Sequence, residues 1–318
     1  MVLRFAVASA DVTAFCQSLM GGADVNELHE GLTPLTMAIE MPDKDISVQF
    51  MELLLNAGAN VNQADAESTP LRKAVALAVS SGLEKVKLLL QRGADIHERG
   101  DNGKCIVSFV LDLQYVEWEH DLLTLLHDTR ADFNAIDNEG MAPLVHLVQK
   151  VKHETSDDNC SSDSVPLRTL QILKRFNVDF NAVDDEGRTA LSTVAEFVQT
   201  GQLNVHAADF VTILIQNSNV NLGTNSTGMS VLQMVSDCDS LTDQVINAGA
   251  DPLHKDQYGR TALHHAVPNS YTFESLLKAG ADPTIVDSRG ETAVQYCERV
   301  SPTNYQIFKS LANAFRQS

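Results

Sequence analysis

Runs of apolar side chains recur along the chain between polar turns, and their spacing predicts helices. Clear examples read Phe-Met-Glu-Leu-Leu-Leu at 50–55, Leu-Leu-Thr-Leu-Leu at 122–126 and Phe-Val-Thr-Ile-Leu-Ile at 210–215. Apolar residues three and four positions apart share one face of a helix, so each run is expected to pack that face against a neighbouring helix. Shorter segments between these runs complete the pattern. It predicts nine consecutive helix pairs.

A five-residue phrase separates the helix pairs and occurs eight times. It reads Gly-Ala-Asp-Val-Asn at 22–26, and further copies start at 58, 93, 130, 177, 217, 249 and 280. The steps between copies are 36, 35, 37, 47, 40, 32 and 31 residues. Self-similarity at a period of about 20–50 residues marks a repeat architecture, because one unit cannot bury its apolar face alone and stacks on the next.

A second phrase keeps the same period and predicts how each pair begins. It reads Leu-Thr-Pro-Leu at 32–35, Ser-Thr-Pro-Leu at 68–71 and Arg-Thr-Ala-Leu at 188–191. Thr is expected to cap the first helix through its hydroxyl, and Pro fits the first helical position, where its missing donor costs nothing. An Asp-x-x-Gly turn precedes the phrase in four copies, beginning at Asp137, Asp184, Asp256 and Asp287.

These phrases resemble the ankyrin-repeat family, whose unit of about 33 residues is a turn and two helices with a Thr-Pro-Leu-His-x-Ala signature. Arg-Thr-Ala-Leu-His-His-Ala at 260–266 is a near-ideal match, and the resemblance covers essentially the whole chain. It implies an all-α solenoid of stacked helix-turn-helix units joined by β-turn or hairpin loops. One domain over 1–318 is expected, with a capping pair at 1–21, full repeats from near 22, 58, 93, 130, 177, 217 and 249, and a capping repeat at 280–318.

Two steps, of 47 and 40 residues, depart most from the family's period. The 47-residue step contains a polar, Ser- and Asp-rich segment at 150–168, which is expected to form a loop between two helices. Phosphorylation would add charge to this acidic segment, and a loop without a role is the alternative. The candidate phosphorylation sites are Thr155, Ser156 and Ser161. The 40-residue step has a longer loop at 202–206, so the stretch from about 113 to 228 is expected to be the most individual part of the chain.

No arrangement of side chains in the sequence indicates catalysis. It contains no nucleophile elbow, no phosphate-cradling glycine loop and no His-Glu-x-x-His helix. The five cysteines are scattered and form no Cys-x-x-Cys pair, which favours a reducing compartment and gives no sign of a zinc site. The resemblance implies that His264 is structural. We therefore expect no enzyme, no cofactor and no metal, and a protein of the cytoplasm or the nucleus.

Acidic residues outnumber basic residues by 42 to 23, for a formal net charge of −19. Such a charge repels a phosphate backbone and attracts basic protein segments, so a protein partner is expected and nucleic acid is not. No stretch is long enough to span a membrane. The resemblance implies that turn tips and first helices line a concave groove that binds other proteins. Carried over by position, with the single Trp added, the candidate partner-binding residues are His29, Glu30, Asp65, Ala66, Asp101, Asn102, Asp112, Trp118, Asn138, Glu139, Gln149, Asp185, Glu186, Glu196, Phe197, Gln257, Tyr258 and Arg289.

The resemblance also implies a modification. Ankyrin repeats are substrates of an asparaginyl hydroxylase that prefers Leu, five residues, an acidic residue, an apolar residue and then Asn. Asn134 and Asn181 fit that spacing after Leu126 and Leu173. The alternative is that these Asn side chains stabilise the turn by hydrogen bonds.

Three classes of function remain open. The leading hypothesis is a non-catalytic scaffold, monomeric on its own, that binds a basic segment of a partner through an acidic concave surface. The second is a regulatory adaptor of a ubiquitin-ligase or signalling complex, or a bacterial effector acting in a host cell. The third is an enzyme that uses the insertion loops, which the missing acid–base and nucleophile patterns disfavour.

Overall fold

The computed structural model describes residues 6–78, 82–113, 119–154, 165–202, 208–267 and 269–316. In these residues the regular structure is helical, with isolated β-bridges beside some turns and no strand. The all-α fold expected from the sequence is therefore confirmed. The chain forms two compact units, a first unit Met1–Asn138 and a second unit Glu139–Ser318. A single continuous domain stays a prediction.

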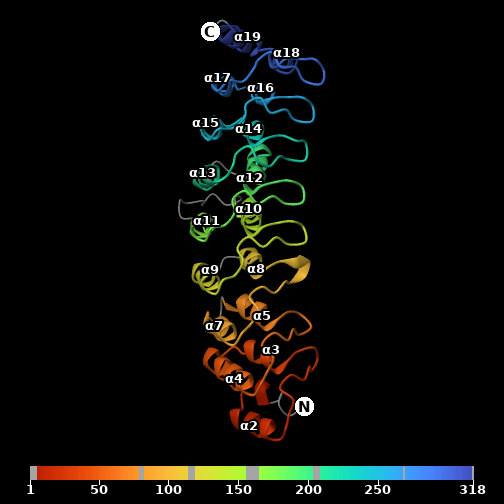
Figure 1. The fold of residues 1–318 in the computed structure, drawn as a ribbon, viewed down its shortest axis with the longest axis vertical. Coiled ribbons are helices and arrows are strands. Elements are labelled where there is room, and N and C mark those ends of the chain that lie inside the picture. Colours follow the sequence, from red (N-terminus) through yellow and green to blue (C-terminus); the bar gives the residue numbers. More distant parts are fainter. Residues whose placement is uncertain are drawn as a thin grey trace. The chain divides into compact units, whose positions relative to one another are not determined.

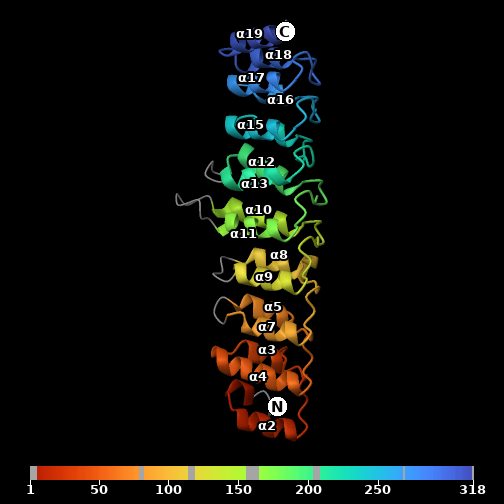
Figure 2. The same cartoon turned by 60° about the vertical axis from the view of Figure 1, so that its left-hand side comes forward.

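The first unit consists of helix pairs stacked on one another, with turns that project to one side (Figures 1 and 2). Residues 6–8 are helical, and α3 packs on α5 as α4 packs on α7. The helix bounds are α2 (Val12–Met20), α3 (Pro34–Ile39), α4 (Lys44–Asn56), α5 (Pro70–Ala76), α7 (Glu84–Gln91), α8 (Ile106–Asp112) and α9 (Glu119–Asp128), with the 3-10 helix η1 (Asp101–Gly103) in a turn.

The second unit repeats this arrangement. Each first helix packs on the first helix of the next pair, and the second helices form a parallel row beside them (Figure 1). The pairs are α10 (Pro143–Glu154) with α11 (Val165–Arg175), α12 (Ala190–Gln199) with α13 (Ala208–Asn217), α14 (Val231–Met234) with α15 (Asp239–Asn247), α16 (Ala262–His265) with α17 (Ser270–Lys278), and α18 (Ala293–Val300) with α19 (Tyr305–Arg316).

The helix starts confirm the capping predicted from the second phrase. Thr33 and Thr69 accept hydrogen bonds from backbone N–H groups of the first turns of α3 and α5, and Pro occupies the first position of both helices. Thr189 and Ser230 cap α12 and α14 in the same way. Asp11 caps α2, the second helix of the first pair. Such caps satisfy N–H groups that a helix leaves without partners.

The core of each unit lies between its helix pairs. Phe15 packs edge-on against Phe50 in the first unit at 5.1 Å between ring centroids, and Phe273 packs against Phe308 in the second at 4.6 Å. All four rings are fully buried. Large buried rings contribute strongly to core stability, so these contacts fix the spacing between neighbouring repeats.

In several copies of the repeated phrase the last residue, an Asn, joins its repeat to the next. Asn26 Oδ1 accepts from Asn60 N at 2.7 Å, and Asn62 Oδ1 accepts from Asp95 N at 2.8 Å. In the second unit Asn181 Oδ1 accepts from Asn219 N at 2.6 Å. Because each bond links residues of two neighbouring repeats, the Asn of the phrase stabilises a contact between repeats as well as a turn.

The 150–168 segment is not a loop throughout. Helix α10 continues to Glu154 because buried Leu147, Val148 and Val151 extend its apolar face, and α11 already begins at Val165, ahead of buried Leu167. The predicted loop was too wide at both ends. Its polar composition concealed apolar spacing that continues from the flanking helices. Thr155, Ser156 and Ser161 lie outside the described residues.

Candidate functional site

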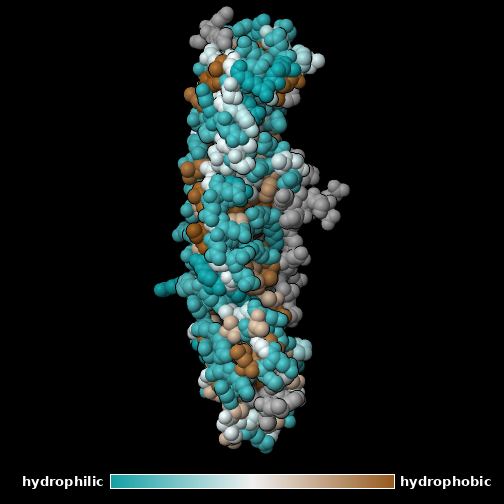
Figure 3. Space-filling model, turned by 90° about the vertical axis from the view of Figure 1, so that its right-hand side faces the viewer, coloured by the Kyte–Doolittle hydropathy of each residue, from teal (hydrophilic) through white to brown (hydrophobic). Residues whose placement is uncertain are grey.

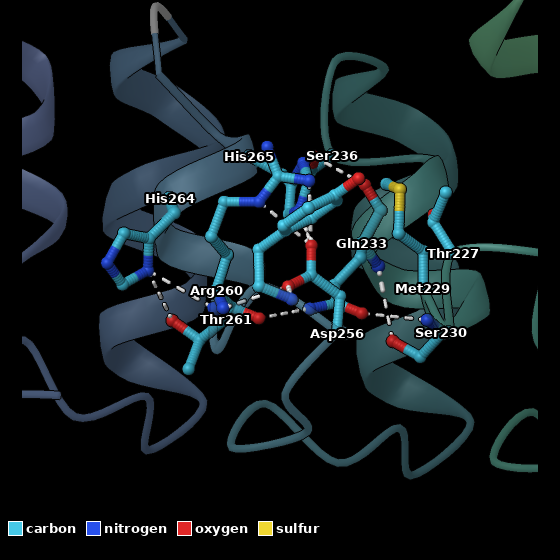
Figure 4. Close-up of polar contacts among 12 residues, drawn as sticks. Thr227, Met229, Ser230, Gln233, Ser236, Asp256, Arg260, Thr261, His264 and His265 are labelled. Atoms are coloured by element: carbon cyan, nitrogen blue, oxygen red, sulfur yellow. Dashed lines mark hydrogen bonds and ion pairs between the residues drawn. The ribbon is translucent and has the colours of Figure 1, made fainter. Parts of the chain in front are cut away.

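The turns before the first helices are held from inside by buried aspartates. Asp256 Oδ1 accepts from the backbone N–H groups of Tyr258 and Arg260, both at 2.9 Å, while Oδ2 contacts the Arg260 guanidinium and His265 Nε2 (Figure 4). Asp184 binds the Glu186 and Arg188 N–H groups and the Arg188 side chain in the same manner. The buried aspartate therefore fixes the turn, and the two residues after it form the exposed tip.

Asp65 was predicted to be an exposed tip residue, and this was wrong. Its side chain is 0% exposed and lies 2.6 Å from the Nζ of Lys73, which is itself only 6% exposed. Its Oδ1 accepts from the N–H groups of Glu67 and Ser68. Burial raises the pKa of Asp65, but these hydrogen bonds outweigh it and hold the pKa below its usual value. Asp65 is the structural aspartate of its turn, and the tip consists of Ala66 and Glu67.

The other predicted tip residues lie on the surface, with His29 half-buried. Exposed tips are formed by Glu30, Asp101, Asn102, Asn138, Glu139, Asp185, Glu186, Gln257, Tyr258 and Arg289. Backbone bonds tie neighbouring tips together, from Asn138 N to Asn102 O at 2.8 Å and from Ser288 N to Tyr258 O at 2.8 Å. The side of the molecule that carries the turns is mostly hydrophilic, with isolated hydrophobic residues (Figure 3). Each unit thus presents a row of polar tips on a fixed backbone.

Three predicted first-helix residues line one hollow in the second unit. This hollow, of about 430 Å³, is lined by Gln149 of α10, by Glu196 and Phe197 of α12, and by Arg188, Thr193, Thr200 and Gln202. Phe197 was predicted to bind a partner, and the residue is only 9% exposed. The hollow lies where the first helices are longest, with 12 residues in α10 and 10 in α12 against four to eight in the first helices of the other pairs from α3 on.

The remaining candidates are dispersed. Asp112 is exposed and forms an ion pair with Lys104 at 2.6 Å. Trp118 lies outside the described residues. Tyr258 lies under the guanidinium of Arg260, whose carbon is 4.9 Å from the ring centroid. Neither Asp112 nor Tyr258 lines the hollow beside α12.

His264 and His265 are structural, as the sequence predicted for His264. His264 Nε2 lies 3.1 Å from the Glu291 carbonyl of the next repeat, and its Nδ1 lies 3.1 Å from Thr261 Oγ1. Burial lowers the pKa of both histidines, that of His265 to about 4, against a smaller raising effect of the hydrogen bond to Asp256. In Figure 4 both side chains lie within this polar network.

The second unit is therefore expected to lose stability between pH 6.5 and about 4. In that window unfolded His265 binds a proton that the folded form, with its pKa of about 4, does not bind, so acidification favours unfolding. The expected slope is about 1.4 kcal/mol per pH unit for one proton. Urea denaturation at several pH values measures it. The variant His265→Gln should lose that part of the slope, and an unchanged slope would contradict the assignment.

Nothing in the described parts points to a metal centre or a membrane span. No group of three or more His, Cys, Asp and Glu side chains there could hold a metal ion. None of the helices searched in the same residues has the length and apolarity needed to cross a bilayer.

Comparison with known proteins agrees with this architecture. A family model described as ankyrin repeats (3 copies) matches residues 3–100, and a single ankyrin-repeat model matches residues 258–288. The chain is an ankyrin-repeat protein. No curated protein sequence matches it. Among solved structures, the ankyrin repeat domain of Bcl-3, described as a unique member of the IkappaB protein family, is similar with a TM-score of 0.57. That match has 18% sequence identity and covers 76% of this chain and 98% of the Bcl-3 chain.

Ankyrin repeats are generally protein–protein interaction modules and are typically non-catalytic. In this ankyrin-repeat protein, residues outside the predicted partner-binding set also belong to these surfaces: Glu67 at a tip, and Arg188, Thr193, Thr200 and Gln202 around the hollow. The spacing of residues in the sequence could have indicated part of the lining of the hollow. Thr193, Glu196 and Thr200 are spaced three and four residues apart, so they share one polar face of a helix.

Proposed function

We propose that this ankyrin-repeat protein is a non-catalytic scaffold that holds a basic segment of a partner protein on its turn tips and first helices. The observation that carries the proposal is the exposed acidic character of the tips at Asp101, Glu139, Asp185 and Glu186. Opposite charge across an interface speeds encounter and selects partners more than it adds affinity. A basic segment is the complement of such a surface.

The electrostatics of the turns support the same partner. The basic side chains near several tips are already committed, since Lys73 contacts Glu40, Asp65 and Glu67, and Arg188 contacts Asp184 and Glu186. These internal pairs neutralise the cations and leave an acidic excess at the tips. The net charge of −19 adds a long-range attraction for cations.

The proposal is tested by replacing Asp101, Glu139, Asp185 and Glu186 with Lys. This tip variant is expected to bind partner proteins about 100-fold more weakly, from roughly 0.7 kcal/mol for each exposed charge. The measurement is affinity purification with the wild type and the variant, with mass spectrometry, followed by affinity measurement on the purified partner.

A matched control variant separates the effect of the acidic tips on binding from the effect of net charge. Asp45, Glu52, Asp121 and Asp209 are exposed on second helices, and their replacement by Lys changes the net charge by the same amount. This control variant should capture the same partners as the wild type. Partners that bind the tip variant and the wild type equally well would overturn the proposal.

Two further elements belong to the proposal. We place the protein in the cytoplasm or nucleus as a monomer that meets its partner there.

Hydroxylation is proposed at Asn134 or Asn181. At Asn181 it would act on a bond that joins two repeats, since Asn181 Oδ1 accepts from the N–H of Asn219. Mass spectrometry of the protein purified from its own cells would detect the added oxygen, and unmodified peptides over both residues would exclude it.

A further inference from the structure

The hollow beside α12 is lined mainly by hydrogen-bond acceptors. The Thr193 hydroxyl donates its only hydrogen to the Thr189 carbonyl at 2.9 Å, and the Thr200 hydroxyl donates to the Glu196 carbonyl at 2.8 Å. A hydroxyl has one donor, so both oxygens can offer only lone pairs to the hollow. Gln149 directs one N–H of its Nε2 toward Met141 Sδ at 3.2 Å, and it keeps its Oε1 as an acceptor beside one further N–H.

The charged groups of the hollow also favour a ligand that donates hydrogen bonds. The Arg188 guanidinium is held by Asp184 at 2.8 Å and by Glu186 at 3.0 Å, so its Nε and one N–H of each terminal nitrogen are directed to carboxylates of its own turn. The Glu196 carboxylate is half-buried and forms no close ion pair with a described residue, while the Arg188 cation attracts it at longer range. The hollow therefore offers a ligand the Glu196 carboxylate, with the neutral acceptor oxygens of Thr193, Thr200 and Gln149 around it.

We propose that this hollow is an anchor site for a basic side chain, arginine or lysine, of the partner segment. The inference rests on the proposed function, and it adds a specific position at which the partner is recognised. A guanidinium or ammonium group carries only donors, which complements a lining of acceptors. The Glu196 carboxylate pairs with the cation, and Thr193, Thr200 and Gln149 accept its remaining N–H groups.

The volume and the apolar surface of the hollow suit such a side chain. Its volume of about 430 Å³ lies near the lower end of the range for small-molecule sites, about 300–1,000 Å³, and accommodates a long side chain. Phe197 contributes apolar surface next to the acceptors. Arginine and lysine carry apolar stems that pack on such surface while the charged group reaches polar partners. An acidic side chain would be repelled by Glu196, and it would bring no donor for the acceptor oxygens.

The test uses a displayed library of random 12-residue peptides, selected on the intact wild-type protein. Selected peptides are then synthesised, and their dissociation constants are measured for the wild type, for Glu196→Gln and for Glu298→Gln. Glu298 is an exposed acid on α18, away from the hollow, so its substitution removes the same charge elsewhere. Thermal unfolding of all three proteins verifies equal folding.

The anchor predicts that one basic residue of the selected peptides depends on Glu196. Glu196→Gln should weaken binding at least about tenfold, and Glu298→Gln less than twofold. Replacing that arginine by citrulline, which keeps the shape and removes the charge, should weaken binding to the wild type but hardly change binding to Glu196→Gln. A lysine in its place shows which of the two cations is preferred.

Three results would overturn the anchor, and they differ in what else they overturn. Basic peptides that lose affinity on the tip variant but bind Glu196→Gln as tightly as the wild type would refute the anchor and leave the proposed function standing. A wild-type selection without enrichment of basic peptides would refute both. Equal effects of citrulline on the wild type and on Glu196→Gln would also refute the anchor.

Discussion

The variant Asp65→Ala is expected to lower the free energy of unfolding of the first unit by about 3 kcal/mol. The substitution removes the buried carboxylate that lies 2.6 Å from Lys73 Nζ, and the buried Lys73 ammonium keeps only the more exposed carboxylates of Glu40 and Glu67. It also leaves the N–H groups of Glu67 and Ser68 without their acceptor. Both effects act on the folded state, because the unfolded chain hydrates the same groups. Chemical denaturation followed by circular dichroism measures the change.

The matched control is Asp101→Ala. Asp101 is an exposed tip residue of the same unit, so its removal should change stability by less than about 0.5 kcal/mol. Equal losses in the two variants would refute the distinction between the aspartate that fixes a turn and the acids that form its tip. That distinction decides which acidic residues are available to a partner.

The variant Gly140→Ala should destabilise the second unit by about 3 kcal/mol and displace a tip. Gly140 has a φ of +72°, where an alanine costs about 1 kcal/mol. A Cβ there would also lie 2.5 Å from the backbone N of Asp185, so the next turn would have to move, which adds about 2 kcal/mol. Because Asp185 and Glu186 form that next tip, partner binding should weaken together with stability.

Gly187→Ala provides the comparison for Gly140→Ala. Gly187 has a similar φ of +76°, but a Cβ built there meets nothing within 4 Å. This variant should lose only the conformational part, about 1 kcal/mol. Denaturation of both variants under the same conditions separates the two contributions. Equal losses would show that contact between successive turns does not position the tips.

The sequence was sufficient for the helices because local rules determine them. Thr33 and Thr69 before Pro-Leu pairs specify helix starts, and Leu spacing specifies the faces that pack. The structural role of His264, which the resemblance implied, agrees with its bond to the next repeat. These features depend on residues within one repeat or at a fixed offset, so the period itself reveals them.

The candidate site depended on contacts that spacing does not encode. Asp65 and Asp185 both follow an apolar phrase and precede a helix, yet one is buried against Lys73 and the other is exposed. The turn that begins at Asp65 is one residue shorter, which shifted the predicted tip by one position. The acceptor character of the hollow is likewise visible only when the bonds of Thr193 and Thr200 are known.

The central claim is that acidic tips hold a basic partner segment, and its most direct test is the salt dependence of binding. Titration calorimetry of the purified partner should give a dissociation constant that rises at least about tenfold between ionic strengths of roughly 50 and 300 mM for the wild type, because salt screens exposed charges. The control with Lys at Asp45, Glu52, Asp121 and Asp209 should behave like the wild type. The tip variant should bind weakly at both. Equal dissociation constants for wild type and tip variant, unchanged by salt, would contradict the account.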